Sequence, residues 1–216
     1  MVAEQFRIIR SNLQYIIGKN EKNTIMVTSS FSGEGKSFIS LNMATAMALA
    51  GKKTIILELD IRKPKVLSGL NMPKGPGISN FLIGKAELED LIQPVQGTEN
   101  LWVLGCGPIP PNPSELLLDP KTDEMFSLLR EKFDVIVIDT APVGMVSDAQ
   151  TLGKFTNCTL YIVRQAYTFK KQITLVDEFY REQKLPHVAI VINDVKVKPG
   201  YGYYGYGRYG YGYGYG

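Results

Sequence analysis

The stretch Ser30-Phe31-Ser32-Gly33-Glu34-Gly35-Lys36-Ser37 decides the fold of this chain. It follows a short β-like run at 24–28 and precedes an apolar helical pattern at 37–50. A strand, a glycine-containing loop and a helix in this order form the phosphate-binding P-loop, here with Ser30 in place of the first glycine. The pattern therefore predicts an α/β domain that binds a nucleotide.

The loop supplies the chemistry that a nucleotide phosphate requires. Gly33 and Gly35 let the backbone approach a phosphate closely, and the helix that begins at Lys36 adds its positive dipole end. We expect Lys36 to place its charge on the β- and γ-phosphates of ATP, and Ser37 to ligate Mg²⁺ with its hydroxyl. ATP and Mg²⁺ are thus the expected cofactors. The residues expected to contact the nucleotide here are Ser32, Gly33, Glu34, Gly35, Lys36, Ser37 and Phe38.

Two further strand-like runs end on acidic residues. Glu58 and Asp60 lie two residues apart in the run 55–62, which places both side chains on one side of an extended segment. Asp139 follows the β-branched run 135–138 and is expected to hold Mg²⁺ directly or through water. Phosphoryl transfer requires carboxylates near the metal and the attacking oxygen. With a P-loop on the same sheet, Glu58, Asp60 and Asp139 are candidate site residues.

Strands and helices alternate along the rest of the chain. This order predicts an α/β fold with a mostly parallel sheet, and right-handed crossovers place helices on both of its faces. The predicted architecture is a P-loop NTPase-like three-layer sandwich with a mostly parallel central sheet and its ligand at the carboxyl ends of the strands. Strands are expected at 24–28, 54–59, 101–104, 134–138, 159–163 and 188–192. Helices are expected at 2–17, 37–50, 78–83, 88–92, 120–132, 147–154 and 170–184, with another starting at Pro113 after a capping Asn112.

Composition excludes several other classes of protein. The chain has 216 residues, enough for one domain and a short extension, and no run of about 18 apolar residues that would indicate a transmembrane helix or a secretory signal. A net charge of +3 forces no polybasic surface, so we expect no nucleic-acid partner. Cys106 and Cys158 lie far apart and His187 is the only histidine, which disfavours a disulfide framework, a zinc site and a histidine-based triad.

Tyrosine and glycine gather at the C-terminal end. Eight of the 12 tyrosines and eight of the 21 glycines lie in residues 200–216. Such a sequence cannot pack a core and its glycines cost entropy to order, so we expect this tail to be disordered and exposed. We therefore divide the chain into a domain at 1–199 and a tail at 200–216. From composition alone, the tail is typical of a sticky low-complexity linker.

The three motifs together resemble a known family. Residues 30–37, 55–62 and 134–142 are similar to the Walker A, A′ and B motifs of bacterial tyrosine kinases (BY-kinases). The segment 105–117 is similar to a loop common in that family, and residues 4–10 resemble its E-x-x-R-x-x-R oligomerisation motif. The likeness covers essentially the whole chain, tail included. It implies a protein-tyrosine autokinase that phosphorylates its C-terminal tyrosines and regulates capsule or exopolysaccharide synthesis and export.

The resemblance also implies roles for single residues. Asp60 matches the second acid of the A′ motif and is implied to orient or deprotonate the incoming tyrosine hydroxyl. Glu58 stands where the family usually has its first aspartate and is implied to contact Mg²⁺ or its waters. Arg62 matches the motif's arginine and is expected to pair with a phosphate or a carboxylate. Asn193 lies where related P-loop ATPases contact the nucleotide base, with a simple turn as the alternative, and Arg164 is a further candidate.

The first helical pattern carries Glu4, Arg7 and Arg10 at a spacing of three, near one helix face. From the residues alone, this is a solvated face with an intrahelical ion pair. The resemblance implies instead a head-to-tail subunit contact in a ring whose tails reach neighbouring sites. It further implies a membrane-spanning activator or fused membrane domain, a counteracting tyrosine phosphatase, and a cytoplasmic location at the inner face of the bacterial cell membrane. The implied phosphoacceptors are Tyr201, Tyr203, Tyr204, Tyr206, Tyr209, Tyr211, Tyr213 and Tyr215.

Two other functions stay open on the sequence. The first is an ATPase of the partitioning and cell-division type, which uses nucleotide to dimerise on DNA or membrane. Such proteins usually carry an extra lysine near the start of the P-loop, and residues 30–34 contain none. The second is a non-enzymatic, nucleotide-dependent regulator of polysaccharide export.

Overall fold

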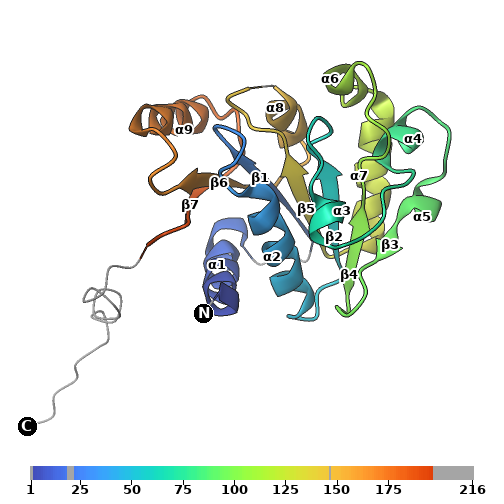
Figure 1. Ribbon diagram of the computed structural model, residues 1–216, viewed down its shortest axis with the longest axis horizontal. Helices are drawn as coiled ribbons and strands as arrows, with labels where there is room; N and C mark the ends of the chain where they lie inside the picture. The colour runs from blue at the N-terminus through green and yellow to red at the C-terminus, as the bar shows by residue number, and fades with distance from the viewer. Residues whose placement is uncertain (1, 19–21, 146, 197–216) are drawn as a thin grey trace, which may run out of the picture.

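In the computed structural model, which describes residues 2–18, 22–145 and 147–196, a seven-stranded sheet forms the middle layer (Figure 1). Its strand order is β3-β4-β2-β5-β1-β6-β7, and all neighbouring strands are parallel except β3 and β4. The strands are β1 (Asn23–Ser29), β2 (Thr54–Leu59), β3 (Gln93–Pro94), β4 (Leu101–Leu104), β5 (Val135–Thr140), β6 (Cys158–Arg164) and β7 (Val188–Asn193).

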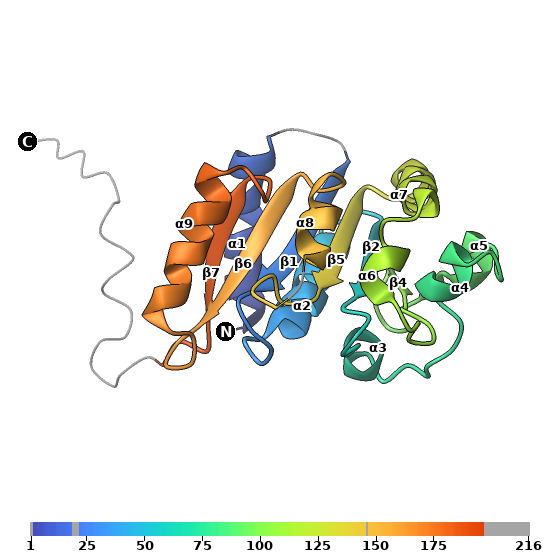
Figure 2. The ribbon, with the colours of Figure 1, turned by 90° about the horizontal axis from the view of Figure 1, so that it is seen from above.

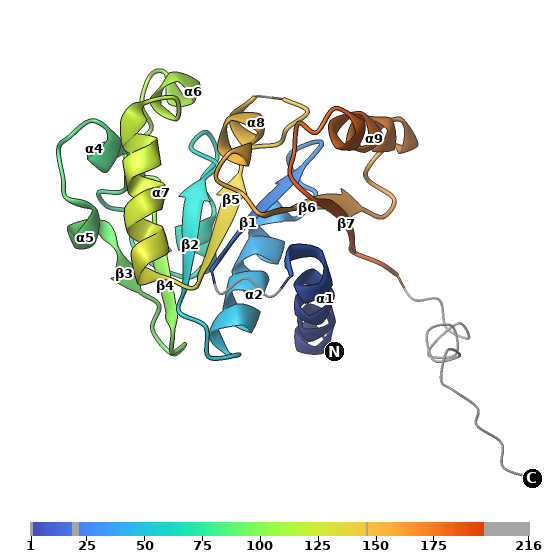
Figure 3. The ribbon, with the colours of Figure 1, turned by 180° about the vertical axis from the view of Figure 1, so that it is seen from behind.

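Helices cover both faces of the sheet, as the predicted three-layer architecture requires. Figures 1 and 3 show the two faces from opposite sides, and Figure 2 shows α2 and α3 on one side of the sheet and α7 on the other. The helices are α1 (Val2–Ile17), α2 (Lys36–Ala48), α3 (Val66–Gly69), α4 (Ile78–Leu82), α5 (Leu88–Leu91), α6 (Pro113–Leu116), α7 (Pro120–Lys132), α8 (Asp148–Gly153) and α9 (Ile173–Arg181), with a 3₁₀ turn η1 (Lys170–Gln172) before α9.

Two apolar cores hold the layers together. One core packs α1, α2 and α3 on the sheet through side chains such as Phe6, Met43 and Leu67. The other packs α4, α5, α7, α8 and α9 on the opposite face, and Phe126 of α7 stacks on Phe155 with ring centroids 4.2 Å apart. Every residue of β2 and β5 is buried, which is why these strands read as continuous apolar runs.

The register of the central strands brings the sequence motifs together. Val27 of β1 lies opposite Asp139 of β5, and Glu58 of β2 lies opposite Asp139 from the other side. The P-loop leaves the end of β1, and α2 begins at Lys36 with Gly35 as its N-cap residue. The carboxyl ends of β1, β2 and β5 therefore form the edge at which the candidate site lies.

Most predicted elements are confirmed, and the differences are local. The helix predicted at 170–184 is η1 followed by α9, which ends at Arg181. The short helix α3 and the antiparallel strand β3 were not predicted. Asn112 is the N-cap residue of α6 with Pro113 first in the helix, but the Asn112 side chain makes no capping hydrogen bond. No helix among the described residues is both long enough and apolar enough to cross a membrane.

Candidate active site

The P-loop takes a conformation that its two glycines make possible. Gly33 and Gly35 have φ angles of +91° and +101°, in the left-handed region that glycine adopts without steric cost. A Cβ atom at Gly35 would also lie only 2.1 Å from Asn193 Nδ2. The loop therefore packs closely on Asn193 at Gly35, and its predicted close approach to a phosphate stays a prediction.

Two polar side chains brace the loop from inside the protein. Ser30, which replaces the first glycine of the usual pattern, shares a 2.8 Å hydrogen bond with the hydroxyl of the buried Tyr161 on β6. The buried carboxylate of Glu34 accepts hydrogen bonds from the Phe31 N–H at 2.7 Å and from the Thr168 hydroxyl. The side chain of Glu34 thus supports the loop, and only its backbone is left for the predicted nucleotide contact.

Arg164, the last residue of β6, and Tyr167, three residues later, donate hydrogen bonds to two carbonyl oxygens of the P-loop. Arg164 donates to the carbonyl oxygen of Gly33 at 2.9 Å and pairs with Asp194 at 3.1 Å. Tyr167 donates from its hydroxyl to the carbonyl oxygen of Ser32 at 2.9 Å. From the sequence, Arg164 was a further candidate without an assigned contact, and Tyr167 was not predicted. Both contacts join residues about 130 positions apart, so no local pattern indicates them.

Asn193, at the end of β7, also contacts the P-loop. Its side-chain amide donates to the carbonyl oxygen of Glu34 at 3.0 Å. This places Asn193 beside the loop, and the predicted contact with a nucleotide base stays a prediction. Phe38, the last residue predicted to contact the nucleotide, is half-exposed and packs edge-to-face on Phe6 of α1 with centroids 6.1 Å apart.

Asp139 lies fully buried at the end of β5, against the first turn of α2. Its carboxylate accepts hydrogen bonds from the hydroxyls of Ser37 at 2.7 Å and Ser40 at 3.0 Å. Burial raises the pKa of Asp139 to about 6, although the Ser37 hydrogen bond and the Lys36 charge oppose that shift. Ser40 was not predicted; its position three residues after Ser37 on a helix was the available signal.

Lys36 and Asp60 form a buried ion pair next to this carboxylate. Lys36 Nζ lies 3.9 Å from Asp60 Oδ2, and the two side chains are 5% and 9% exposed. Burial lowers the pKa of Lys36 and raises the pKa of Asp60, because in each case it penalises the charged form. The P-loop lysine and the predicted catalytic acid are thus brought together.

Arg62 pairs with a carboxylate, one of the two partners expected for it. It donates to the Ser114 hydroxyl at 2.6 Å and lies 3.5 Å from Asp148 Oδ2. Ser114 in turn donates to the other oxygen of the buried Asp148 at 2.6 Å. Arg62, Ser114 and Asp148 therefore tie the end of β2 to α6 and α8, and the sequence indicated only the first of these three residues.

Glu58, expected to contact Mg²⁺ or its waters, has a structural role in the protein. Its carboxylate is 2% exposed, and it accepts hydrogen bonds from the backbone N–H groups of Val66 at 2.6 Å, Leu67 at 3.3 Å and Cys106 at 3.2 Å. Both oxygens are therefore occupied by backbone donors. The side chain of Glu58 thus caps α3 and fixes the loop at Cys106, and its predicted contact with Mg²⁺ or its waters stays a prediction.

The remaining oxygen ligands fit a magnesium ion that is bound together with a nucleotide. Mg²⁺ usually keeps several waters and takes one or two protein oxygens plus substrate phosphates. The Ser37 hydroxyl and the Asp139 carboxylate lie side by side at the start of α2 and supply such a pair. Among the described residues, no group of three or more His, Cys, Asp or Glu side chains could hold a metal ion. An ion here would therefore depend on phosphate oxygens.

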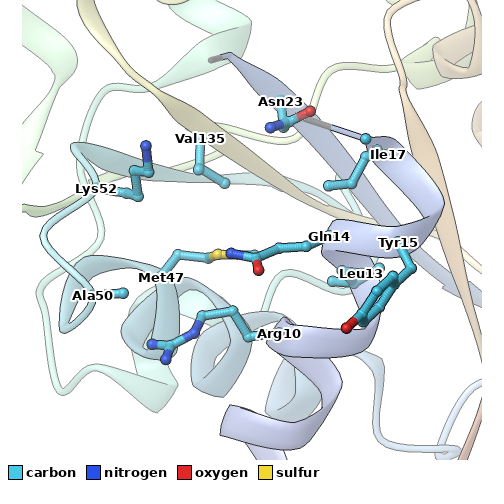
Figure 4. Close-up of a pocket in the computed structure, with 11 residues that line it drawn as sticks. Arg10, Leu13, Gln14, Tyr15, Ile17, Asn23, Met47, Ala50, Lys52 and Val135 are labelled. Atoms are coloured by element: carbon cyan, nitrogen blue, oxygen red, sulfur yellow. The ribbon is translucent and has the colours of Figure 1, made fainter. Parts of the chain in front are cut away.

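The charged face of α1 shows both intrahelical and interhelical contacts. Glu4 and Arg7 form an exposed ion pair at 3.2 Å, as the residues alone suggested. Arg10 instead donates to the carbonyl oxygen of Ala46 on α2 at 2.8 Å. Arg10 also lines a 580 Å³ cavity between α1 and α2, with Met47 on the facing helix (Figure 4). The predicted subunit contact stays a prediction, and the predicted phosphoacceptors at 201–215 lie outside the described residues.

Comparison with known proteins defines the class of this domain. Residues 25–201 match the family described as CbiA, the CobQ/CobB/MinD/ParA nucleotide binding domain. The crystal structure of the chimerical protein CapA2B2 superposes with a TM-score of 0.82 at 35% identity, covering 88% of this chain and 83% of that one. The predicted P-loop NTPase-like fold is thereby confirmed.

Sequence relatives narrow the assignment. The putative tyrosine-protein kinase CapB of Staphylococcus aureus is 42% identical over 162 residues, which is 74% of this chain and 71% of the relative. The tyrosine-protein kinase YwqD of Bacillus subtilis (strain 168) is 32% identical over 195 residues, 90% of this chain and 82% of the relative. The chain belongs to the bacterial tyrosine-protein kinases, as the resemblance of its three motifs implied.

Proposed function

We propose that this domain is an ATP- and Mg²⁺-dependent autokinase that phosphorylates the tyrosines of its own C-terminal tail, in a neighbouring subunit. The observation that carries the proposal is the meeting of Lys36, Asp60 and Asp139 around the P-loop, with Lys36 Nζ 3.9 Å from Asp60. A phosphate-binding lysine, a proton acceptor and a metal-binding carboxylate are the groups that phosphoryl transfer to a hydroxyl requires.

Different residues of the site have different roles in the proposed phosphoryl transfer. The P-loop N–H groups and the Lys36 ammonium bind the β- and γ-phosphates, and Ser37 and Asp139 would hold a Mg²⁺ ion, which would supply positive charge to the phosphate oxygens. The tyrosine oxygen then forms a bond to the γ-phosphorus, the bond from that phosphorus to the bridging oxygen breaks, and ADP leaves. The phenolic proton passes to Asp60, whose pKa is raised by burial and which is therefore a better acceptor than an exposed carboxylate.

The experiment that tests this function is incubation with labelled ATP and Mg²⁺, followed by mass spectrometry of the tail. We expect phosphotyrosine among residues 201–215 in the wild-type chain. We expect at least a hundredfold slower incorporation in Lys36→Met and in Asp60→Asn, since each removes a group that acts in the transition state. ATP hydrolysis without tail phosphotyrosine would contradict the proposal and support the partitioning-type ATPase instead.

We further propose that the kinase acts in a ring held in part by α1, at the inner face of the cell membrane, with a membrane-spanning partner of a polysaccharide-export system and a tyrosine phosphatase that opposes it. Family membership and the exposed Glu4 and Arg7 support this. Each phosphate adds about −1.5 to −2 charges, and mutual repulsion of phosphorylated tails would loosen the ring. Light scattering tests this: an equal oligomeric mass before and after phosphorylation would contradict it.

A further inference from the structure

A second cavity lies beside the candidate site, past the strand end that carries Asp60. It has a volume of 490 Å³, within the range of small-ligand sites. Three prolines, Pro64, Pro76 and Pro108, line it and give its walls fixed backbone geometry. Leu67 and Ile109 add further apolar surface. We call this cavity the proline slot.

One basic side chain lines the proline slot, and it belongs to a basic segment of the chain. Residues 61–86 include five basic residues and no acidic one. The exposed Lys74 lines the slot, and so does Cys106 at its floor. Burial raises the pKa of Cys106 to about 12, and the Lys74 charge opposes that rise. Glu58 also lines the floor, but its oxygens accept hydrogen bonds from backbone N–H groups. The slot therefore combines apolar walls with one exposed cationic side chain, Lys74.

The proline slot and the candidate site are joined by a short stretch of backbone. Glu58 lines the slot, and Asp60 lies two residues further along the chain. The N–H of Lys63 donates to Asp60 at 3.2 Å, and the next residue, Pro64, lines the slot. A Tyr-Gly unit in an extended chain covers roughly 7 Å. A tail with one tyrosine at Asp60 therefore has further tyrosines at a spacing short enough to reach the slot.

We propose that the proline slot binds a phosphotyrosine of the chain's own C-terminal tail, with the ring between the prolines and the phosphate at Lys74. The proposal rests on the proposed function, because the ligand is the product of that reaction. The tail sequence offers only tyrosine, glycine and Arg208, so its rings are the groups that fit an apolar slot. Fully extended, residues 197–216 reach up to roughly 70 Å, enough to cross the sheet of their own subunit or to enter a neighbour.

In this proposal, the slot takes up the phosphotyrosine product from the catalytic site. A phosphotyrosine carries about −1.5 to −2 charges. It is attracted by Lys74 at the slot, whereas the site that it leaves holds the carboxylates of Asp60 and Asp148 together with their partners Lys36 and Arg62. Transfer of the product from the catalytic site to Lys74 in the slot frees Asp60 for the next tyrosine while the tail stays bound. Several tyrosines of one tail are then phosphorylated in a single encounter.

A binding measurement tests the slot directly. The probe is a labelled synthetic peptide of residues 200–207 with one phosphotyrosine at position 203, added to the dephosphorylated full chain without nucleotide. We expect Lys74→Glu to weaken its binding about tenfold, the loss of one charge-assisted contact. Ile109→Ser should also weaken it, and it should leave the fold intact because Ile109 is 58% exposed. Lys85→Glu is the matched control, an exposed lysine of the same basic segment outside the slot.

Three results would overturn the slot proposal. The first is a Lys74→Glu variant that binds the phosphotyrosine peptide as tightly as the wild type does, at an unchanged melting temperature. The second is a loss of affinity in Lys85→Glu as large as that in Lys74→Glu. The third is a wild-type affinity for the matching phosphoserine peptide equal to that for the phosphotyrosine peptide. The second would mean general electrostatic attraction, and the third would mean that no ring is recognised.

A second readout keeps this proposal distinct from the proposed function. Early in the autokinase reaction, mass spectrometry should find multiply phosphorylated tails in the wild type and mainly singly phosphorylated tails in Lys74→Glu, with Lys85→Glu like the wild type. If the wild type forms tail phosphotyrosine and Lys74→Glu shows the same distribution, the slot proposal alone fails. If the wild type forms none, the proposed function fails, and the synthetic phosphopeptide still tests the slot.

Discussion

The substitution Glu58→Gln distinguishes a structural carboxylate from a metal ligand. Glu58 occupies the position that the resemblance assigned to the metal site, yet its oxygens accept three backbone N–H bonds, from Val66 at 2.6 Å, Leu67 at 3.3 Å and Cys106 at 3.2 Å. Glutamine keeps the size of the side chain but presents an N–H₂ group in place of one oxygen. At least one backbone donor then faces another donor.

The expected loss of stability follows from these contacts. A buried N–H group left without an acceptor costs about 1–3 kcal/mol, and the bonds that remain lose the strength that the charge gave them. Removing a buried charge recovers part of this cost in desolvation. We therefore expect the free energy of unfolding to fall by about 2–4 kcal/mol, a large share of the roughly 5–15 kcal/mol typical of a domain.

Urea unfolding and nucleotide binding together provide the assay. With a slope of about 2 kcal/mol per molar urea, the midpoint of Glu58→Gln should fall by about 1–2 M. The affinity of its folded form for a fluorescent nucleotide, with and without Mg²⁺, should stay near that of the wild type. Asp139→Asn is the contrasting variant and should lose the Mg²⁺-dependent part of the affinity. An unchanged urea midpoint with at least a tenfold loss of Mg²⁺-dependent affinity in Glu58→Gln would refute the structural role.

Three further predictions concern the P-loop and its neighbours. Ser30→Ala and Tyr161→Phe should each cost about 1 kcal/mol in urea unfolding, and the double variant about as much as either alone, because both break one buried 2.8 Å hydrogen bond; strict additivity would contradict this. Gly35→Ala should weaken nucleotide binding at equilibrium, since a φ of +101° strains any residue that has a Cβ, and the Asn193 side chain, 2.1 Å from that Cβ, would have to move. Burial raises the pKa of Asp139 from 3.8 to about 6. Between pH 3.8 and about 6, the native chain therefore binds more protons at Asp139 than the unfolded chain does. Without metal, its stability should fall by about 2 kcal/mol as the pH rises from 4 to 6.5. A wild-type decline no steeper than that of Asp139→Asn would contradict the assignment.

The sequence predicted those parts of the site that depend on local pattern. The P-loop, the acid at the end of β5 and the pair Glu58 and Asp60 all follow from a strand, a turn and the spacing of side chains. Strand alternation correctly places Glu58 and Asp60 at the same edge. It does not show which loops fold back over them, and the loop that carries α3 takes up the carboxylate of Glu58.

The contacts that escaped prediction join distant parts of the chain. Arg62 meets Ser114 and Asp148 across separations of 52 and 86 residues, and Ser30 meets Tyr161 across 131. Such pairings depend on the strand order of the sheet, and a single sequence holds no local sign of them. The antiparallel strand β3 escaped for a related reason: it has two residues, one of them a proline, and only an edge position makes it a strand.

The ion pair of Lys36 and Asp60 couples the strength of the proposed base to the presence of the nucleotide. At 3.9 Å, the Lys36 charge favours the ionised form of Asp60 and so opposes the rise in pKa that burial causes. When phosphates take up the Lys36 charge, that opposition weakens, and the affinity of Asp60 for a proton increases. We propose that Asp60 is a better acceptor for the tyrosine proton when a phosphoryl donor occupies the P-loop than when the loop is empty. In a site without nucleotide, Asp60 is still paired with Lys36 and is a weaker acceptor for the tyrosine proton. Deprotonation of the tyrosine is thereby coupled to phosphoryl transfer.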